Sequence, residues 1–342
     1  MTHDLAAAKN LEEEQIRAAV EQLTDENIPA ATKAAFLSQL AAKGETVEEI
    51  AAFARALREK AIAPPLTAAT RAREILDVCG TGGDHLNTFN ISTTVAIVCA
   101  AAGIAVAKHG NRAVTSKSGS ADVLEALGIP VDLSPAAAAQ ALHEHNFAFF
   151  FAPNFHPAFK HIAPARKLCA ARGQRTIFNF LGPLLNPARP TAQLVGVPRP
   201  HLCEPLAQVL QALGIRRGMV VSGKTPDGNL DELSTLGETT VAEFYHERGF
   251  TVSSFSPEQF PLQSATLADL AGGDRDANAE IVRRLLRGDE RGPKRDAVLL
   301  NAAAALFVAG QVRTLADGWE RAVELIDSGT AFSKLKALTS FA

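Results

Sequence analysis

The sequence of 342 residues lacks the features of a membrane-spanning or disulfide-bonded protein. No apolar run approaches the length of about 18 residues that a membrane span needs, and the opening residues, MTHDLAAAKNLEEEQ, contain no hydrophobic signal segment. The cysteines are Cys79, Cys99, Cys169 and Cys203, and none belongs to a CxxC pair. Because neither a disulfide framework nor a zinc site fits this spacing, we expect a cytoplasmic protein without a membrane partner.

An excess of basic charge is also missing. The chain has 34 Lys and Arg against 37 Asp and Glu, a formal net charge of −3, so we expect no nucleic-acid partner. Neither HExxH, GxSxG nor GxGxxG occurs. Residues 218–225, GMVVSGKT, match the letters of a P-loop. MVVS has the composition of a strand, however, and the following PDGN indicates a turn where a P-loop needs a helix.

The first 65 residues have a helical pattern and are expected to form a small, all-helical N-terminal domain. Thr46 and Glu49 match a capping box, which places a helix start at this point. Pro64 and Pro65 then stop helix formation and mark a linker. We expect a further helical segment near 172–190 to pack on this domain.

From residue 74 to residue 342, short β-branched runs alternate with Ala-rich helical stretches. Such alternation predicts an α/β domain with a mostly parallel central sheet. The expected strands are 75–78, 104–107, 147–151, 194–197 and 219–222, and the expected helices are 91–102, 119–127, 134–145, 202–213, 276–287, 294–309 and 314–328.

Residues 78–93, VCGTGGDHLNTFNIST, lie where the first strand passes into a helix. Glycines allow close approach of the backbone, and the carboxyl ends of parallel strands and the N-termini of helices are where phosphates bind. Ser92 and Thr93 would lie in the first helical turn. A phosphate site and an ordinary tight loop both fit this composition.

Two further polar segments could complete an anion site. After the second strand, three cations, Lys108, Arg112 and Lys117, stand among hydroxyl-bearing residues; this suits a large anion or a solvated loop. Asp231 and Glu232 follow the turn after the fifth strand. Paired carboxylates on a loop are Mg²⁺ ligands or solvated surface, and we expect this pair to lie on an exposed loop.

The segments DVCGTGGDHLNTFNIST, AKHGNRAVTSKSGSADVLEALG, RTIFNFLGPLLNPA and DELS occur in this order. They resemble the anthranilate phosphoribosyltransferase family over nearly the whole chain. The resemblance implies a nucleoside phosphorylase/phosphoribosyltransferase-like fold and a homodimer formed through the helical domain. It implies transfer of the 5-phosphoribosyl group from 5-phosphoribosyl 1-diphosphate to the amine of anthranilate, with release of diphosphate, the second step of tryptophan biosynthesis from chorismate. Alternatives are a pyrimidine-nucleoside phosphorylase-like enzyme and a noncatalytic nucleic-acid-binding relative.

The resemblance also assigns site residues, none of them a covalent nucleophile. It implies anthranilate contacts by Gly80, Asn111 and Arg166, and two Mg²⁺ ions with Ser92, Asp231 and Glu232 as ligands. His85 stands where a glycine is common in the family. The donor contacts that it implies are Gly80, Gly83, Asp84, Thr88, Asn90, Ile91, Ser92 and Thr93 in the first block, and Lys108, His109, Gly110, Asn111, Arg112, Ala113, Val114, Thr115, Ser116 and Ser120 in the second.

Overall fold

The N-terminal part of the computed structural model, which describes residues 9–113, 117–246 and 249–340, is helical as expected. It contains α2 (Glu13–Thr24), α3 (Ala30–Lys43) and α4 (Val47–Glu59), followed by the short α5 (Ala68–Arg71). The predicted capping box is present at the start of α4. The Glu49 backbone N–H donates to Thr46 Oγ1 at 3.2 Å, and the Thr46 N–H donates to the Glu49 carboxylate at 2.9 Å.

The remainder is built on a sheet that has eight strands within the described residues, in the order β3-β2-β1-β4-β5-β7-β8, with β6 also paired to β5. Strands β1 to β5 pair in parallel, whereas β6, β7 and β8 are antiparallel. The mostly parallel sheet is therefore confirmed, but the three antiparallel strands were not predicted. The strands are β1 (Ile75–Gly80), β2 (Ala105–Gly110), β3 (Phe147–Phe151), β4 (Ala192–Gly196), β5 (Arg217–Thr225), β6 (Gly228–Leu230), β7 (Thr239–Tyr245) and β8 (Gly249–Phe255).

The P-loop-like letters of 218–225 lie inside β5, which turns into β6 and not into a helix. This confirms the interpretation of that segment as a strand. No helix among the residues that the structure describes is both long enough and apolar enough to cross a membrane.

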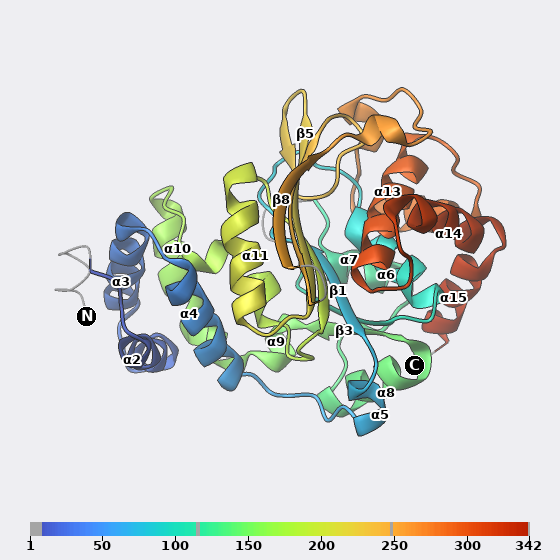
Figure 1. Ribbon diagram of the computed structural model, residues 1–342. Coiled ribbons are helices and arrows are strands. Elements are labelled where there is room, and N and C mark those ends of the chain that lie inside the picture. The colour runs from blue at the N-terminus through green and yellow to red at the C-terminus, as the bar shows by residue number, and fades with distance from the viewer. Residues whose placement is uncertain (1–8, 114–116, 247–248, 341–342) are drawn as a thin grey trace.

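Helices cover both faces of the sheet (Figure 1). One face packs against α6 and the C-terminal helices, and its core includes Val78, Phe149 and Leu300. On the other face, α11 lies between the sheet and the N-terminal helices, and α8 covers the region of β3. These helices are α6 (Ile91–Ala101), α7 (Ser120–Ala126), α8 (Pro135–His145), α9 (Ala152–Phe155), α10 (Ala163–Ala171), α11 (Cys203–Ala212), α12 (Arg275–Arg287), α13 (Pro293–Val308), α14 (Leu315–Asp327) and α15 (Thr330–Thr339).

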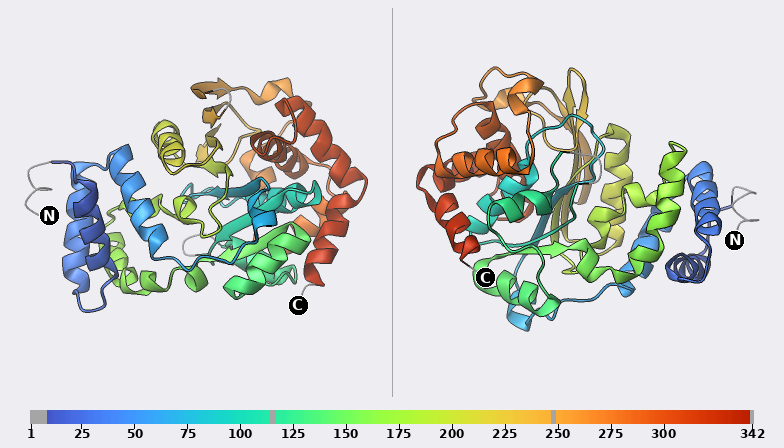
Figure 2. Two further views of the ribbon diagram at one scale, coloured as in Figure 1. Left: turned by 60° about the horizontal axis from the view of Figure 1, so that its bottom comes forward. Right: turned by 180° about the vertical axis from the view of Figure 1, so that it is seen from behind.

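The N-terminal helices share one apolar core with the sheet. Phe53 and Leu57 of α4 belong to the same buried cluster as Leu206 of α11 and Val195 and Val220 of the sheet. The two further views show the N-terminal helices and the C-terminal helices on opposite sides of the molecule (Figure 2). The helical N-terminal part thus packs against one face of the sheet through this shared core.

The helix that packs on α3 from the α/β part is α10, which ends before residue 172. The segment 172–190 differs from the expected helical segment, because it contains only two short 3-10 turns, η2 (Ile177–Asn179) and η3 (Gly182–Leu185). Pro183 and Pro187 explain this, since proline removes a backbone donor and disfavours the helical conformation of the residue before it.

Candidate active site

The glycine-rich loop between β1 and α6 has an unusual, firmly anchored backbone. Gly82, Gly83, His85 and Asn87 all have positive φ, with 61° at His85. The far side of the loop is bound to the segment before α12, because the Gly272 N–H donates to the Asn87 carbonyl at 2.9 Å. The loop is therefore held in one shape at the carboxyl end of β1.

The acidic segment after β6 folds back onto this loop. Asp231 Oδ2 accepts a hydrogen bond from the Gly82 N–H at 2.7 Å. A Cβ at Gly80 would lie 2.0 Å from Asp231 Oδ2, and a Cβ at Gly196 would lie 1.5 Å from the Asp231 carbonyl oxygen. Glycine is thus required at the ends of both β1 and β4, because only a residue without a side chain leaves room for Asp231.

Glu232 places a carboxylate at the N-terminus of α6. Its Oε1 accepts the Ser92 N–H at 3.2 Å, whereas Asn90, the residue before the helix, gives no side-chain cap. Helix N-termini attract negative charge through their free N–H groups and partial positive charge. The structure therefore brings together Ser92, Asp231 and Glu232, and the first turn of this helix takes its hydrogen-bond acceptor from Glu232.

The expectation that the acidic pair lies on an exposed loop is wrong. Glu232 is only 9% exposed, and Asp231 is half-buried against the glycine-rich loop. Burial, followed by the charge of Asp84, raises the pKa of Asp231 to about 7. Burial and the charge of Asp231 likewise raise the pKa of Glu232 well above its usual range. The sequence could not show this burial, because it arises where the chain returns after β6 and packs against the carboxyl ends of β1 and β4.

Lys108 supplies positive charge beneath these carboxylates. Its buried ammonium donates to the Val78 carbonyl at 2.7 Å and to Ser92 Oγ at 3.4 Å. Burial raises the pKa values of Glu232 and of the neighbouring Asp77, and the attraction of the Lys108 ammonium offsets part of that rise. The cation therefore ties β2 to β1 and to the first turn of α6.

Asp77 is a site residue that the sequence analysis missed. It is fully buried in β1, where its carboxylate accepts hydrogen bonds from the Asn186 side-chain amide at 2.8 Å and from the His109 N–H at 3.3 Å. Burial raises its pKa to about 6. The sequence signal for Asp77 was a carboxylate within the apolar strand ILDVCG, because a buried charge needs a partner.

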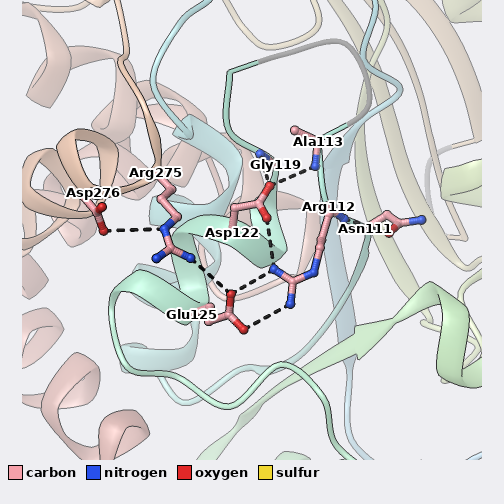
Figure 3. A network of polar contacts seen from close by, with 8 residues as sticks. All are labelled: Asn111, Arg112, Ala113, Gly119, Asp122, Glu125, Arg275 and Asp276. Carbon is pink, nitrogen blue, oxygen red and sulfur yellow. Dashed lines mark hydrogen bonds and ion pairs between the residues drawn. The ribbon is translucent and has the colours of Figure 1, made fainter.

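The second polar loop is closed by an ion-pair network (Figure 3). One carboxylate oxygen of Asp122 accepts the N–H groups of Ala113 and Gly119, both at 2.9 Å. The guanidinium of Arg112 binds Glu125 through both of its terminal nitrogens, at 2.9 and 3.1 Å, and Asp122 at 3.2 Å. Arg112 therefore braces the loop in this structure, whereas its sequence context suited either an anionic ligand or a solvated loop.

The other residues expected in the second block do not all lie in one environment. Val114, Thr115 and Ser116 lie outside the described residues. Gly110 and Ser120 lie close together, since a Cβ at Gly110 would meet Ser120 Oγ at 2.5 Å. Asn111, Arg112 and Lys117 are exposed, whereas Ser118 is buried.

The remaining first-block residues serve the fold as well as the loop. Ile91 is buried in the main core, and Thr93 is also buried. Asn90 donates to the Ser118 carbonyl at 3.3 Å and accepts a hydrogen bond from Asn278 at 2.9 Å. The two loops therefore touch each other and α12. Gly83 lies beside the guanidinium of Arg175, a cation that the sequence analysis did not single out.

Arg166, the expected anthranilate contact, lies on α10 with its guanidinium 5.5 Å from the ring centroid of Phe178. Successive ring contacts lead from there to the second block: Phe178 to Phe159 at 5.9 Å, Phe159 to His156 at 5.0 Å and His156 to His109 at 5.3 Å. This aromatic row was also missed. Its signal is the aromatic and histidine content of FHPAFKH after β3.

Both histidines of the row are neutral near pH 7. Burial lowers the pKa of His109 to about 3, and burial lowers the pKa of His156 to about 4. His109 donates through Nδ1 to the Gly182 carbonyl at 3.3 Å, and its buried Nε2 has no hydrogen-bond partner among the described residues. The row therefore offers an uncharged wall in which the buried Nε2 of His109 has no partner among the described residues.

The oxygen donors of Ser92, Asp231 and Glu232 fit a hard divalent cation. No group of three or more His, Cys, Asp and Glu side chains within the described parts of the chain is arranged to hold a metal ion by itself. Mg²⁺ is usually bound by one or two carboxylates together with waters and substrate phosphates. Two crowded carboxylates beside the N-terminus of a helix, one buried and one half-buried, match that incomplete donor set.

Comparisons with known proteins agree with this geometry. Residues 72–332 match the model of the glycosyl transferase family a/b domain, and residues 2–61 match that of its helical bundle domain. Anthranilate phosphoribosyltransferase of Lacticaseibacillus casei is 48% identical over 97% of this chain and 94% of its own length. The chain belongs to the anthranilate phosphoribosyltransferase family. The main function predicted from the sequence, that of a pentosyl-transferring glycosyltransferase of tryptophan biosynthesis, is thereby confirmed.

Solved members of the family share the whole architecture. The anthranilate phosphoribosyltransferase of Thermus thermophilus is 41% identical and has a TM-score of 0.90, covering 99% of this chain and 98% of its own. The Saccharomyces cerevisiae protein in complex with PRPP and Mg is 28% identical with a TM-score of 0.84, covering 100% and 93%. The same yeast protein in complex with 4-fluoroanthranilate has 26% identity and a TM-score of 0.83, with the same coverage.

Proposed function

We propose that the protein binds 5-phosphoribosyl 1-diphosphate on the glycine-rich loop and the start of α6. The observation that carries the proposal is the helix end at Ser92, which has no cap of its own and accepts the Glu232 carboxylate. The donor's diphosphate brings the same charge to the same N–H groups. The donor complex of the yeast relative supports this reading. Gly80, Gly83, Asp84, Thr88, Asn90, Ile91, Thr93, Lys108 and residues 109–116 with Ser120 complete the proposed donor site.

Mg²⁺, as two ions, is proposed to accompany the donor, with Ser92, Asp231 and Glu232 as protein ligands. When bound, it neutralises negative charge that develops on the leaving diphosphate. The protein's own part is to hold the ligands in place: Gly82 fixes Asp231, and Ser92 fixes Glu232. Lys108 adds a fixed positive charge below the pair.

Anthranilate is proposed to bind between Gly80, Asn111 and Arg166, along the aromatic row. Arg166 suits the carboxylate, because a guanidinium binds it through two parallel hydrogen bonds. The aromatic row suits the ring, and the neutral imidazoles keep a second cation away from it. The amine of anthranilate is unprotonated at neutral pH, so positioning it against the ribose is the main requirement, and no covalent nucleophile is assigned.

We also propose a homodimer formed through the N-terminal helices and a cytoplasmic location. The resemblance to the family supports the dimer. The four cysteines, each a free and buried thiol, support a reducing compartment. Sedimentation velocity of the purified protein, compared with a variant carrying charge reversals on the exposed face of α2, tests the dimer.

The decisive experiment measures diphosphate release from 5-phosphoribosyl 1-diphosphate with and without anthranilate. We expect release only when both anthranilate and Mg²⁺ are present. Phosphorolysis of thymidine is assayed in parallel, because a pyrimidine-nucleoside phosphorylase-like enzyme would be active there. Release that does not depend on anthranilate, or thymidine phosphorolysis alone, would contradict the proposal.

A further inference from the structure

A second cationic site lies at the linker between the helical part and the α/β part. A pocket of about 250 Å³ opens there, lined by Arg58 and Glu59 at the end of α4, by Ala61 and Ala63 of the linker, and by Asn186, Pro187 and Arg189. We call it the linker pocket. It shares no lining residue with the glycine-rich loop or with the second polar loop.

Arg58 enters this pocket with part of its guanidinium unsatisfied. Its Nε donates to the Leu184 carbonyl at 2.6 Å, but its Nη2 is buried and has no hydrogen-bond partner among the described residues. The neighbouring Glu59 does not neutralise it, since the Glu59 carboxylate forms an ion pair with Arg17 at 3.0 Å. A buried donor without an acceptor is costly, so this nitrogen fits an acceptor supplied by a ligand.

Two further arginines increase the positive charge beside Arg58. Arg189, an exposed residue, also lines the pocket and has a φ of 50°, a conformation that arginine rarely adopts. Arg71 is near it and donates to the Ala188 carbonyl. None of the three makes an ion pair with a carboxylate in the parts of the chain that the structure describes.

The crowding of like charge is visible in the acid–base behaviour of this cluster. Burial, and then the charge of Arg189, lowers the pKa of Arg58 to about 10. The same two causes lower the pKa of Arg71. Since guanidinium groups pair closely with planar or tetrahedral oxyanions and are weakly hydrated, an anion between Arg58 and Arg189 would remove this repulsion.

We propose that the linker pocket is a binding site for a phosphate-class oxyanion, separate from the donor site. Arg58 supplies its free Nη2 from the helical side, and Arg189 supplies its guanidinium from the α/β side. The volume of the pocket accommodates a phosphate group with several waters, each of which takes about 30 Å³ in the liquid. The bound anion bridges the end of α4 and the segment after η3.

The test is calorimetric titration of the full-length protein with inorganic phosphate at constant ionic strength. The main variant is Arg189→Asn, because Asn tolerates positive φ better than most residues. Arg58→Gln is the second variant, and Arg313→Gln, which removes an exposed arginine outside the pocket, is the matched control. Because the glycine-rich loop could also bind phosphate, the number of ions bound per chain is measured together with the affinity.

We expect wild type and Arg313→Gln to bind one more phosphate per chain than Arg189→Asn, or to bind it about ten- to a hundredfold more tightly, as for loss of a charged hydrogen bond. Equal stoichiometry and affinity for wild type and Arg189→Asn would overturn the proposal, as would the absence of phosphate binding to wild type. If Arg58→Gln fails to fold, Arg189→Asn decides the matter alone. Neither outcome depends on diphosphate-release activity, so this test is independent of the test of the donor-site proposal.

Discussion

Replacement of Glu232 by Gln tests the proposed metal site most directly. The amide keeps the shape of the side chain and an oxygen that can still accept the Ser92 N–H at the start of α6. It removes one unit of negative charge from a buried pair that includes Asp231. The expected result is therefore a loss of Mg²⁺ affinity without collapse of the loop.

The magnitude follows from the surroundings of the carboxylate. A unit charge about 4 Å from another, at an effective permittivity of about 20, interacts by about 4 kcal/mol. Relief of the repulsion between Asp231 and Glu232 offsets part of this in the variant. A remaining loss of about 1.4–2.8 kcal/mol corresponds to a ten- to hundredfold higher Mg²⁺ concentration at half-maximal turnover. We also expect a lower kcat, since leaving-group stabilisation weakens.

When Mg²⁺ is absent, the Glu232→Gln variant should be more stable than the wild type. An acid whose pKa is raised in the folded protein releases its proton more readily when unfolded, so the unfolding free energy falls as pH rises above the unfolded pKa. For this pair the window begins near the ordinary carboxyl pKa and reaches at least pH 7, the value at Asp231. Glu232→Gln should therefore melt at a higher temperature than wild type in metal-free buffer at pH 7, and Mg²⁺ should raise its Tm less.

The assay is a Mg²⁺ titration of turnover, with melting temperatures measured with and without Mg²⁺. Glu238→Gln is the matched control, because Glu238 is an exposed carboxylate in the same loop. Superimposable Mg²⁺ curves for wild type and Glu232→Gln would refute the reasoning. A metal-free Tm well below that of wild type would show that the carboxylate stabilises the fold and is not strained by its charged neighbour.

Three further predictions concern the proposed anthranilate site, the carboxyl end of β4 and stability at acid pH. Arg166→Ala should raise the KM for anthranilate about ten- to a hundredfold with little effect on the KM for the donor; an unchanged anthranilate KM in steady-state kinetics contradicts the assignment. Gly196→Ala, whose Cβ would overlap the Asp231 carbonyl oxygen at 1.5 Å, should lower stability by about 1–3 kcal/mol in urea unfolding and reduce activity. Gly182→Ala, which has open space, serves as its control, and equal losses in both would count against the packing argument. His156 has a pKa lowered to about 4 by burial, so its imidazole should lower stability by up to about 1.4 kcal/mol per pH unit as pH drops from about 6.5 toward 4, in addition to the effect of His109. His156→Phe should flatten that slope in unfolding measured at pH 7, 6 and 5, and an identical slope would mean that the imidazole does not titrate this way.

The parts of the fold predicted from sequence are those encoded by local patterns. The capping box at Thr46 and Glu49 and the run Phe147–Phe151 are examples, since the residues that define each element are neighbours in the chain. The hairpin of β7 and β8 was missed although its Thr, Val and Phe residues are typical of strands. Its outer strand is mostly exposed, so the alternation of buried and exposed positions is weak there.

The candidate site divides in the same way. Glycine and hydroxyl content marked the first loop, because a backbone-lined anion site has a compositional signature. The burial of Glu232 and the partners of Asp77 were beyond the sequence, because both depend on chain segments more than a hundred residues away. The pairing of Arg112 with Glu125 spans only 13 residues, but it was not predicted either, because it depends on how the loop returns to α7.

The shared core of the N-terminal helices and the sheet has a consequence for the order in which the chain folds during synthesis. The first helices leave the ribosome with Phe53 and Leu57 ready for burial, but their partners in α10, α11 and β5 are made only later. Domains made first generally fold first, yet here the leading segment must wait with its apolar face uncovered until about residue 220 has emerged. The newly made N-terminal part thus exposes apolar side chains during synthesis that later segments cover.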